Sequence, residues 1–309
     1  MQELKFIKYI SKKFKTKSPV IKGIGDDCAV LKYTRHKYLL LTCDMIIEGT
    51  HFTKRTAPYQ IGWKAMAVNI SDIASMGGIP KYALVSAGVS RSKGMKFLKE
   101  IVRGVDAISK KFGVNVIGGD TNGSGKTVVN VTLMGEVEKN CLVARSGAED
   151  GDLIFVTGAL GEGKTKHLNF EPRLKEARIL VKNFKIDSMI DLSDGLAMDL
   201  NRLAKASGVG ARVYKSLIPL PEQFQTRIGK LSNAGLESTL VEVISSGEDF
   251  ELLFTASLKE SKKMIKRMGK KGDLPITLIG EIVDKRFGVR LIGENGKTSL
   301  LGSEGFVHL

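Results

Sequence analysis

The sequence predicts a mixed α/β (α+β) fold in two domains. Strand-like and helix-like segments alternate through the first half of the chain and start again in the second half, which is typical of mixed α/β architecture. A polar stretch, Ser146–Asp152 (SGAEDGD), separates the two halves. The 309 residues, 42% of them hydrophobic, are enough for two medium-sized domains with ordinary packed cores. We therefore expect an N-terminal domain over residues 1–146 and a C-terminal domain over residues 147–309.

Periodicity and turn residues place the elements of the first half. Apolar residues at helical spacing predict an amphipathic N-terminal helix that ends before Pro19, and Gly113 is expected to stop a later helix. The expected helices are 1–18, 60–76 and 92–112, and the expected strands are 38–47, 81–89, 114–117 and 127–137.

The second half is expected to hold strands and helices in similar proportion. Gly208 lies just past the end of one expected helix. The expected strands are 153–157, 187–190, 250–255 and 275–282, and the expected helices are 173–182, 195–206 and 258–268. Residues 288–309 are expected to form short strands and turns.

The chain is strongly basic, with a formal net charge of +15. Such a charge is compatible with a nucleic-acid partner or with anionic substrates. The lysines are spread over expected helix surfaces, for example Lys96, Lys99 and Lys262, and no basic stripe interleaved with aromatic residues is visible. We therefore favour a solvated basic surface and no nucleic-acid partner. A nucleic-acid binder stays open as an alternative, which predicts an affinity that falls steeply with salt.

Cysteine content and hydropathy bear on the compartment. Cys28, Cys43 and Cys141 are an odd number of cysteines without a C-x-x-C pair, so neither a disulfide framework nor a structural zinc site is expected. The N-terminus has no apolar signal core, and the chain has no 18-residue apolar run. We expect a soluble cytoplasmic protein with no membrane partner.

Aspartates next to glycines and apolar residues are the most informative feature. A carboxylate in such surroundings is unfavourable unless it is paired or bound to a cation, and glycine lets the backbone approach a ligand closely. Proteins commonly hold Mg²⁺ through a few carboxylates together with substrate phosphates, so the pattern predicts magnesium-assisted nucleotide chemistry. For each single motif the alternative is a surface turn. The five places are Gly23–Asp27 (GIGDD), Thr42–Asp44 (TCD), Asn69–Asp72 (NISD), Gly118–Thr121 (GGDT) and Asp191–Gly195 (DLSDG).

Two of these motifs can be narrowed further. Asp72 falls in an expected helix with little polar face, between Ile70 and Ile73, so a surface turn explains it poorly. Asp26 and Asp27 are adjacent and would point to opposite faces of an extended chain, so only one of them is expected to bind metal.

A second phosphate-binding pattern competes with the aspartates. Gly158–Thr165 (GALGEGKT) fits G-x-x-x-x-G-K-[ST] and follows an expected strand. In a P-loop, Lys164 would contact phosphates and Thr165 would hold Mg²⁺. A P-loop opens a long helix, however, and Pro172 would interrupt one here. We therefore expect a turn with a solvated lysine.

Seven motifs occur in order between about residue 23 and residue 255. They are GIGDDCAV (23–30), EGTHF (48–52), KAMAVNISD (64–72), GGD (118–120), ARSG (144–147), DLSDG (191–195) and GEDFEL (247–252). As a set they resemble the thiamine-monophosphate kinase family, in the aminoimidazole ribonucleotide synthase-like superfamily. The resemblance implies an N-terminal domain that dimerises through a β-barrel, a C-terminal α/β domain, and ATP bound in the cleft between them.

The resemblance also implies roles for single residues. ATP and thiamine monophosphate would be the substrates, several Mg²⁺ ions the cofactor, and a homodimer the assembly. The metal ligands would be Asp27, Thr42, Asp44, Asp72, Asp120 and Asp191, with Asp194 holding a further metal. The nucleotide would contact Gly119, Asp120, Arg145 and Ser193, and thiamine monophosphate would contact His51 and Glu248. His36, His167 and His308 lie in no motif, and we expect them at the surface.

The chain departs from the family pattern in three places. Cys43 stands where the family usually has a small hydroxyl residue, and a thiol is a poor Mg²⁺ ligand, so any contact there is expected through the backbone. The segment 162–173 is shortened. Ser303 replaces a tryptophan that usually lies against the thiamine, and we expect Phe306 to supply an aromatic face instead. The altered tail affects the thiamine pocket more than the ATP site.

The expected chemistry needs no acid or base from the protein. A phosphate monoester is largely dianionic at neutral pH, with a second pKa of about 6, so charge neutralisation and in-line alignment suffice. We expect direct transfer from ATP without a phosphoenzyme, with Arg145 adding a fork of donors for phosphate. Two further alternatives stay open. One is another ATP-using superfamily member, such as an aminoimidazole ribonucleotide synthase or a hydrogenase-maturation dehydratase, and the other is a nucleotide-binding paralogue without catalysis.

Overall fold

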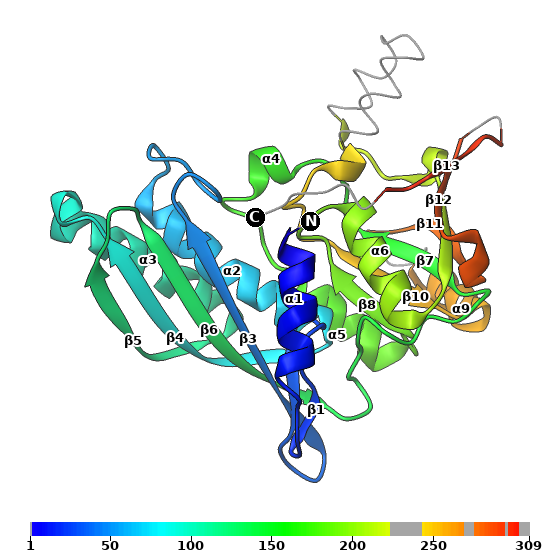
Figure 1. Cartoon of the computed structure of the whole chain (residues 1–309), viewed down its shortest axis with the longest axis horizontal. Helices are drawn as coiled ribbons and strands as arrows, with labels where there is room; N and C mark the ends of the chain where they lie inside the picture. Colours follow the sequence, from blue (N-terminus) through cyan, green and yellow to red (C-terminus); the bar gives the residue numbers. More distant parts are fainter. Residues whose placement is uncertain (1, 223–242, 269–274, 294–295, 303–309) are drawn as a thin grey trace. The chain divides into compact units, whose positions relative to one another are not determined.

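The computed structural model describes residues 2–222, 243–268, 275–293 and 296–302. They fold into two compact units (Figure 1). The N-terminal unit comprises the residues up to Leu142 together with Leu168–Leu174. The C-terminal unit comprises Val143–His167 and the residues from Lys175 on. Each unit combines a sheet with helices, which confirms the mixed α/β fold class.

The N-terminal unit is built on a six-stranded sheet with the order β1-β2-β3-β6-β4-β5. Neighbouring strands are antiparallel except β4 and β5, which are parallel. The strands are β1 (Val20–Lys22), β2 (Ala29–Lys32), β3 (Lys37–Ile47), β4 (Ile79–Val89), β5 (Asn115–Gly123) and β6 (Val128–Glu138). The helices are α1 (Gln2–Lys13), α2 (Pro58–Ser75), the 3-10 turn η1 (Arg91–Lys93) and α3 (Gly94–Phe112).

One face of this sheet is covered by α2, and α3 packs against α2 (Figure 1). Leu40 on β3 and Val131 on β6 are fully buried on the covered face. Along β6 buried residues alternate with half-buried ones, as expected for a strand with one face against a core. The helix α2 is buried over most of its length, so any polar side chain on it needs a partner inside the protein.

Two glycines let α2 and α3 cross with their backbones in contact. A Cβ added at Gly62 on α2 would lie 2.0 Å from the carbonyl oxygen of Ile101 on α3. A Cβ added at Gly104 on α3 would lie 1.9 Å from the carbonyl oxygen of Tyr59 on α2. No side chain fits at that distance, so the crossing depends on glycine at both positions.

We expect Gly104→Ala to destabilise the protein by about 1–3 kcal/mol, because the added methyl group must push two helix backbones apart. This loss outweighs the gain of roughly 1 kcal/mol that alanine normally brings to a helix interior. The matched control is Gly125→Ala, where a Cβ would meet no atom within 4 Å. Thermal unfolding of the two variants checks the prediction, and an unchanged melting temperature for Gly104→Ala would contradict it.

The C-terminal unit is built on a seven-stranded sheet with the order β13-β12-β9-β11-β7-β10-β8. The only parallel pair among these described strands is β9 with β12. The strands are β7 (Leu153–Thr157), β8 (Ser188–Asp191), β9 (Gly210–Tyr214), β10 (Leu252–Ala256), β11 (Ile276–Val283), β12 (Val289–Ile292) and β13 (Thr298–Leu300). The helices are α4 (Gly163–Lys166), α5 (Leu174–Asn183), α6 (Leu196–Ser207) and α9 (Leu258–Met268), with the 3-10 turns η2 (Lys215–Leu217) and η3 (Lys285–Phe287).

The core of the C-terminal unit lies between its central strands and α6. Leu200 and Leu203 on α6 join Ile154 of β7 and Ile190 of β8 in one buried apolar cluster. Gly208 ends α6 in the left-handed conformation, with φ 73°. The segment that connects β8 to α6 carries the DLSDG motif.

Most of the expected elements are present, and the exceptions are instructive. Strands β1, β2 and β9 were not predicted, and β5 continues to Gly123, so the GGD motif lies inside a strand instead of after one. Two adjacent glycines lower strand propensity, which hid the second half of β5, but pairing with β4 supplies the missing stabilisation. The stop at Gly113 is confirmed, with φ 69°.

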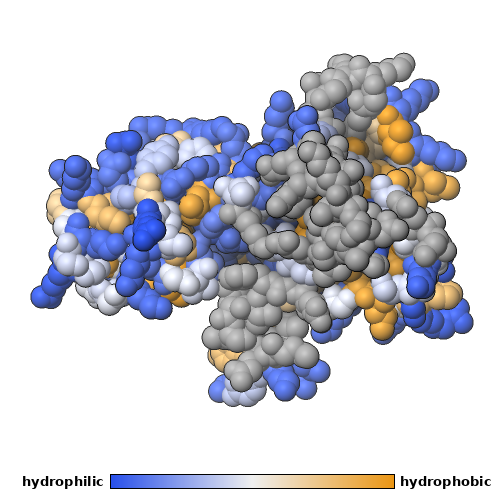
Figure 2. All heavy atoms as spheres, turned by 90° about the horizontal axis from the view of Figure 1, so that it is seen from above, coloured by the Kyte–Doolittle hydropathy of each residue, from blue (hydrophilic) through white to orange (hydrophobic). Residues whose placement is uncertain are grey.

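Several charged side chains on α3 are exposed to solvent and pair with one another. On α3, Lys110 pairs with Asp106 and Arg103 pairs with Glu100, all within the same helix. Hydrophilic residues cover much of the face shown in Figure 2. Within the described residues, no helix is both long enough and apolar enough to span a bilayer.

Candidate active site

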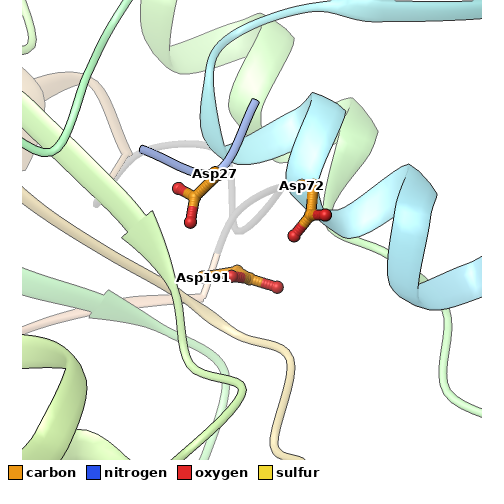
Figure 3. Close-up of side chains that lie close together, drawn as sticks. All are labelled: Asp27, Asp72 and Asp191. Atoms are coloured by element: carbon orange, nitrogen blue, oxygen red, sulfur yellow. The ribbon is translucent and has the colours of Figure 1, made fainter. Parts of the chain in front are cut away.

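Two carboxylates lie close together in the N-terminal unit. One oxygen of Asp27, which precedes β2, and one oxygen of Asp72, on α2, are within 4.8 Å of each other. Ser75 donates a hydrogen bond of 2.7 Å to Asp27, and Thr42 on β3 donates one of 2.5 Å to Asp72. Figure 3 shows both carboxylates. Two carboxylates this close together, one of them buried, are suited to binding a divalent cation.

Further oxygen ligands stand on the neighbouring strand β3. Thr42 is buried and Asp44, two residues on, points to the same face of the sheet. The backbone N–H of Asp44 donates to Oδ1 of Asn69 on α2 (3.1 Å), and Asn69 in turn donates to the carbonyl of Ala65. Asn69 thus ties β3 to the helix turn before Asp72, a positioning role that the sequence did not reveal.

The side chain of Cys43 points to the opposite face of β3. It is exposed and lies 3.4 Å from Asn130 Oδ1 and 3.4 Å from Thr132 Oγ1 on β6. The thiol is therefore turned away from the face that carries Thr42 and Asp44. The candidate metal ligands on this face are the oxygen atoms of Asp27, Asp72, Thr42 and Asp44. An all-oxygen set of ligands fits Mg²⁺.

Gly119 and Asp120 lie on β5, three strands away from β3 in the same sheet. Asp44 is in register with Val131 on β6, which is in register with Val85 on β4, and Val85 pairs with Gly119. Three strand spacings amount to about 14 Å. The N-terminal unit therefore does not bring Asp120 to the Asp27–Asp72 pair.

The local geometry of β5 explains the glycine beside Asp120. A Cβ at Gly119 would lie 1.7 Å from the carbonyl oxygen of Val85, so only glycine allows this strand pair to form. The carboxylate of Asp120 is exposed and accepts hydrogen bonds from the Thr121 N–H (2.8 Å) and the Asn122 side chain (2.6 Å).

His51 is held in the turn after β3 by three contacts. Its N–H donates to the carbonyl of Ile47, and its Nδ1 accepts the N–H of Ile47 at 3.0 Å. Lys64, fully buried on α2, donates from Nζ to the carbonyl oxygen of His51 at 2.9 Å. With Nδ1 acting as an acceptor, the neutral imidazole carries its proton on Nε2, which can then donate to a ligand. Lys64 lies in a recognised motif, but sequence alone did not indicate this anchoring role.

In the C-terminal unit, Asp191 ends β8 and Ser193 and Asp194 precede α6. Figure 3 also labels Asp191. Asp194 is buried and forms an ion pair with Arg202. Arg202 also binds Asp199 at 2.8 Å, and Asp199 accepts the N–H of Asp194 at 2.9 Å.

Asp199 and Arg202, both on α6, fix the DLSDG segment through their contacts with Asp194. Asp199 is fully buried, and burial raises the pKa of its carboxyl. Arg145 lies near Asp199 and Arg202 and interacts electrostatically with both. The backbone carbonyl oxygen of Arg145 accepts a hydrogen bond from the hydroxyl of Ser207 at the end of α6. Arg145, Asp194 and the segment that contains Ser193 therefore belong to one region of this unit. The pair of Asp199 and Arg202 was not among the predicted site residues. Its signal in the sequence is an acidic residue on the apolar face of a helix, followed by an arginine three residues later.

Glu248 lies in the loop before β10, in a left-handed backbone conformation with φ 70°. Its carboxylate is 2.9 Å from Nδ1 of His167. The expectation that His167 is simply a surface residue is therefore wrong, since its side chain is largely covered and paired with an expected substrate ligand. Phe306 and Ser303 lie outside the described residues.

The P-loop alternative is not supported by the geometry. The helix that follows Gly158–Thr165 is α4, which spans only Gly163–Lys166, and Thr165 donates its hydroxyl to the carbonyl of Glu162 (3.0 Å). A P-loop would need a long helix in this place.

Comparison with known proteins decides the family. Residues 25–137 match the family model described as AIR synthase related protein, N-terminal domain, and residues 142–292 match the corresponding C-terminal domain. The thiamine-monophosphate kinase of Buchnera aphidicola subsp. Acyrthosiphon pisum is 34% identical, with 97% of this chain and 96% of the relative covered. The thiamine-monophosphate kinase of Bacillus subtilis is 34% identical over 100% of this chain and 99% of the relative. The chain belongs to the thiamine-monophosphate kinase family.

A solved structure agrees with this assignment over the whole fold. AaThiL complexed with AMPPCP and TMP is 29% identical and superposes with a TM-score of 0.83, covering 100% of this chain and 98% of that one. The resemblance found in the motifs is therefore confirmed. The two-domain architecture of the thiamine-monophosphate kinase family accounts for both units of the described structure.

One more carboxyl group in this region gives a testable pH dependence. Asp249 follows Glu248, and burial raises the pKa of its carboxyl to about 7, although backbone N–H groups of Gly161 and Gly163 oppose the shift. Because the pKa is higher in the folded than in the unfolded state, the folded protein binds this proton more tightly. Its contribution to stability is therefore full below about pH 4 and is lost as the pH rises through 7.

We expect the stability of the protein, relative to an Asp249→Asn variant, to fall by roughly 1–4 kcal/mol between pH 5 and pH 9. Asparagine cannot titrate, so the variant lacks this part of the pH dependence. Urea unfolding of both proteins across that range checks the difference. Parallel pH profiles for the two proteins would contradict the prediction.

Proposed function

We propose that this chain is a thiamine-monophosphate kinase, which transfers the γ-phosphoryl group of ATP directly to the phosphate of thiamine monophosphate. Family membership and the likeness to AaThiL complexed with AMPPCP and TMP support the reaction. The observation that carries the mechanism is the close pair of carboxylates Asp27 and Asp72, with the hydroxyl of Thr42 bound to the second.

The metal ligands are Asp27, Thr42, Asp44 and Asp72 of the N-terminal unit, joined by Asp191 and Asp194 of the C-terminal unit. Magnesium bound by these oxygen ligands supplies positive charge that lets two anionic phosphate groups approach each other. The all-oxygen donor set, and two carboxylates within 4.8 Å of each other, support this proposal. Asp199 and Arg202 keep the Asp194 segment in place.

The nucleotide and acceptor ligands follow from the same motifs. Gly119, Asp120, Arg145 and Ser193 contact ATP, with the guanidinium of Arg145 donating to phosphate oxygens. On the acceptor side, His51 donates from Nε2, and Glu248 and Phe306 contact thiamine monophosphate. The fixed Nδ1 contact of His51 supports this orientation. No acid or base from the protein is required, because the acceptor phosphate is already ionised.

A homodimer completes the site. The face of the N-terminal sheet opposite α2 exposes apolar side chains, among them Met45 on β3 and Tyr82 and Leu84 on β4, with exposed fractions of 50%, 41% and 46%. A patch of this kind on a sheet marks an interaction surface, and a second copy of the sheet closes it into a β-barrel. Because Asp120 lies about 14 Å from Asp44 within one chain, the second copy supplies Asp120 to the metal site.

The remaining assignments concern domains and compartment. The N-terminal domain, predicted over residues 1–146, binds ATP and magnesium and dimerises, and the domain predicted over residues 147–309 is the C-terminal α/β domain; the two compact units divide four residues earlier, between Leu142 and Val143. The enzyme works in the cytoplasm, where its three cysteines, all free thiols, stay reduced.

The decisive assay follows both products. With ATP, Mg²⁺ and thiamine monophosphate, we expect ADP and thiamine diphosphate to form in a 1:1 ratio, separated by chromatography. Without Mg²⁺ we expect no turnover. Tight binding of ATP with no thiamine diphosphate would favour a non-catalytic nucleotide-binding protein, and ATP hydrolysis stimulated by a different acceptor would favour another member of the superfamily.

A further inference from the structure

The glycine-rich turn Gly161–Gly163, which belongs to the P-loop-like motif, already holds a carboxyl group from its own chain. The N–H of Gly161 is 3.0 Å from both oxygens of the Asp249 carboxylate, and the N–H of Gly163 is 2.8 Å from Oδ1. The backbone of Glu162 also stabilises the charged form of this carboxyl. Successive backbone N–H groups that converge in this way form an anion-binding concavity. Here the carboxyl group of Asp249 fills it in place of a phosphate.

The turn and the loop that carries Asp249 interlock closely. A Cβ at Gly163 would lie 2.3 Å from the carbonyl oxygen of Gly247, and a Cβ at Gly158 would lie 2.2 Å from the side chain of Glu251. Glu251 also accepts the hydroxyl of Thr157 at 2.6 Å. The approach at Gly163 is to backbone atoms and leaves no room for a side chain, so Gly163 is needed to seat the 247–251 loop against the turn; Gly158 also adopts a positive φ of 57°, which favours glycine.

The other side of the same loop is bound to the DLSDG segment. The N–H of Glu248 donates to the carbonyl of Ser193 (2.7 Å), and the N–H of Phe250 donates to the carbonyl of Leu192 (2.8 Å). Glu248 and Phe250 both have positive φ, 70° and 51°. Such backbone strain persists only where the surroundings hold the chain on both sides.

The segment that follows the turn also positions the side chain of Glu248, through His167. His167 follows the short helix α4, and its N–H donates to the carbonyl of Gly163. Its Nδ1 lies 2.9 Å from the Glu248 carboxylate. The segment Gly161–His167 thus contacts two adjacent acidic residues. Backbone N–H groups of Gly161 and Gly163 bind Asp249, and the imidazole of His167 pairs with Glu248.

We propose that Asp249 is a positioning residue, whose carboxylate fills the Gly161–Gly163 turn and thereby fixes Glu248 against thiamine monophosphate. This rests on the proposed function, in which Glu248 contacts that substrate. The motif that resembles a P-loop then serves the acceptor site from within the protein and does not bind ATP.

The test compares Asp249→Asn and Asp249→Ala with Lys164→Ala and Glu248→Gln in the full chain. For the Asp249 variants we expect the KM for thiamine monophosphate to rise about tenfold or more, with the KM for ATP changed less than about threefold. Lys164→Ala should leave both values within a few-fold. The double variant Asp249→Asn/Glu248→Gln should be no worse than the worse single variant, because both act on one contact.

A readout without substrate separates this proposal from the proposed function. Hydrogen exchange at the Gly161 and Gly163 amides should be slow in the unmodified protein and at least about tenfold faster in Asp249→Asn. If the chain makes no thiamine diphosphate, the proposed function fails, while the exchange result still reports whether Asp249 holds the turn. Unprotected amides in the unmodified protein, or an unchanged KM for thiamine monophosphate in folded Asp249 variants of an active enzyme, would overturn the proposal. A KM increase for ATP alone would overturn it in favour of a P-loop.

Discussion

Replacing Asp72 with asparagine is expected to lower kcat by about a thousandfold at millimolar Mg²⁺, equivalent to roughly 4 kcal/mol of transition-state stabilisation. Asp72 stands on a buried helix, within 4.8 Å of Asp27, and its carboxylate accepts the Thr42 hydroxyl. Asparagine keeps the size and one acceptor oxygen, so the fold should persist. It removes the charge that we propose holds the metal, and charge neutralisation is the main catalytic requirement of this kind of phosphoryl transfer.

The matched control for Asp72→Asn is Asp106→Asn. Asp106 is an exposed aspartate on α3 that pairs with Lys110, so its loss should leave kcat unchanged. Raising Mg²⁺ should recover part of the activity of Asp72→Asn but not affect Asp106→Asn. A value of kcat within about fivefold of the unmodified enzyme in folded Asp72→Asn, at limiting Mg²⁺, would show that Asp72 holds no essential metal.

The second large effect is expected from Leu84→Lys. Leu84 is 46% exposed on the uncovered face of the N-terminal sheet, and a lysine there places a charge in the proposed dimer interface. We expect a monomer by light scattering and a loss of kcat of about a hundredfold or more, because the second copy no longer supplies Asp120. Val102→Lys, on α3 and 64% exposed, is the control and should remain dimeric and active.

Subunit mixing tests whether the site is composite. Asp72→Asn and Asp120→Asn should each be inactive as homodimers. In a mixed dimer one site carries both substitutions and the other carries neither, so random co-assembly should restore about a quarter of the unmodified activity. No recovery in a purified mixed dimer would mean that both residues act within one chain. An active Leu84→Lys monomer would contradict the shared site independently.

Sequence reasoning succeeded where a local pattern had only one physical explanation. Asp72 interrupts an apolar helical repeat, so a carboxylate with a partner was predictable, and Thr42 is a partner of it in the described structure. Glycines 113 and 208 marked helix ends, because the left-handed conformation needs glycine. The fold class followed from alternating periodicities over the whole chain.

Contacts between distant segments were beyond the reach of sequence. Asp249 and Gly161 are far apart in the chain, and nothing local to either indicates that one carboxylate fills the turn of the other. The pairing of His167 with Glu248 is of the same kind. Asp120 was grouped with the other aspartates by motif, but only the strand order places it three strands from Asp44.

We propose that Asp27 and Asp72, with their neighbours, bind divalent cations around the triphosphate. The most direct measurement is a titration of Mn²⁺, followed by electron paramagnetic resonance, in the presence of AMPPCP. We expect the unmodified chain to bind at least one more Mn²⁺ ion tightly than Asp72→Asn does, and Asp106→Asn to bind as many as the unmodified chain. Equal Mn²⁺ binding by all three proteins would contradict it.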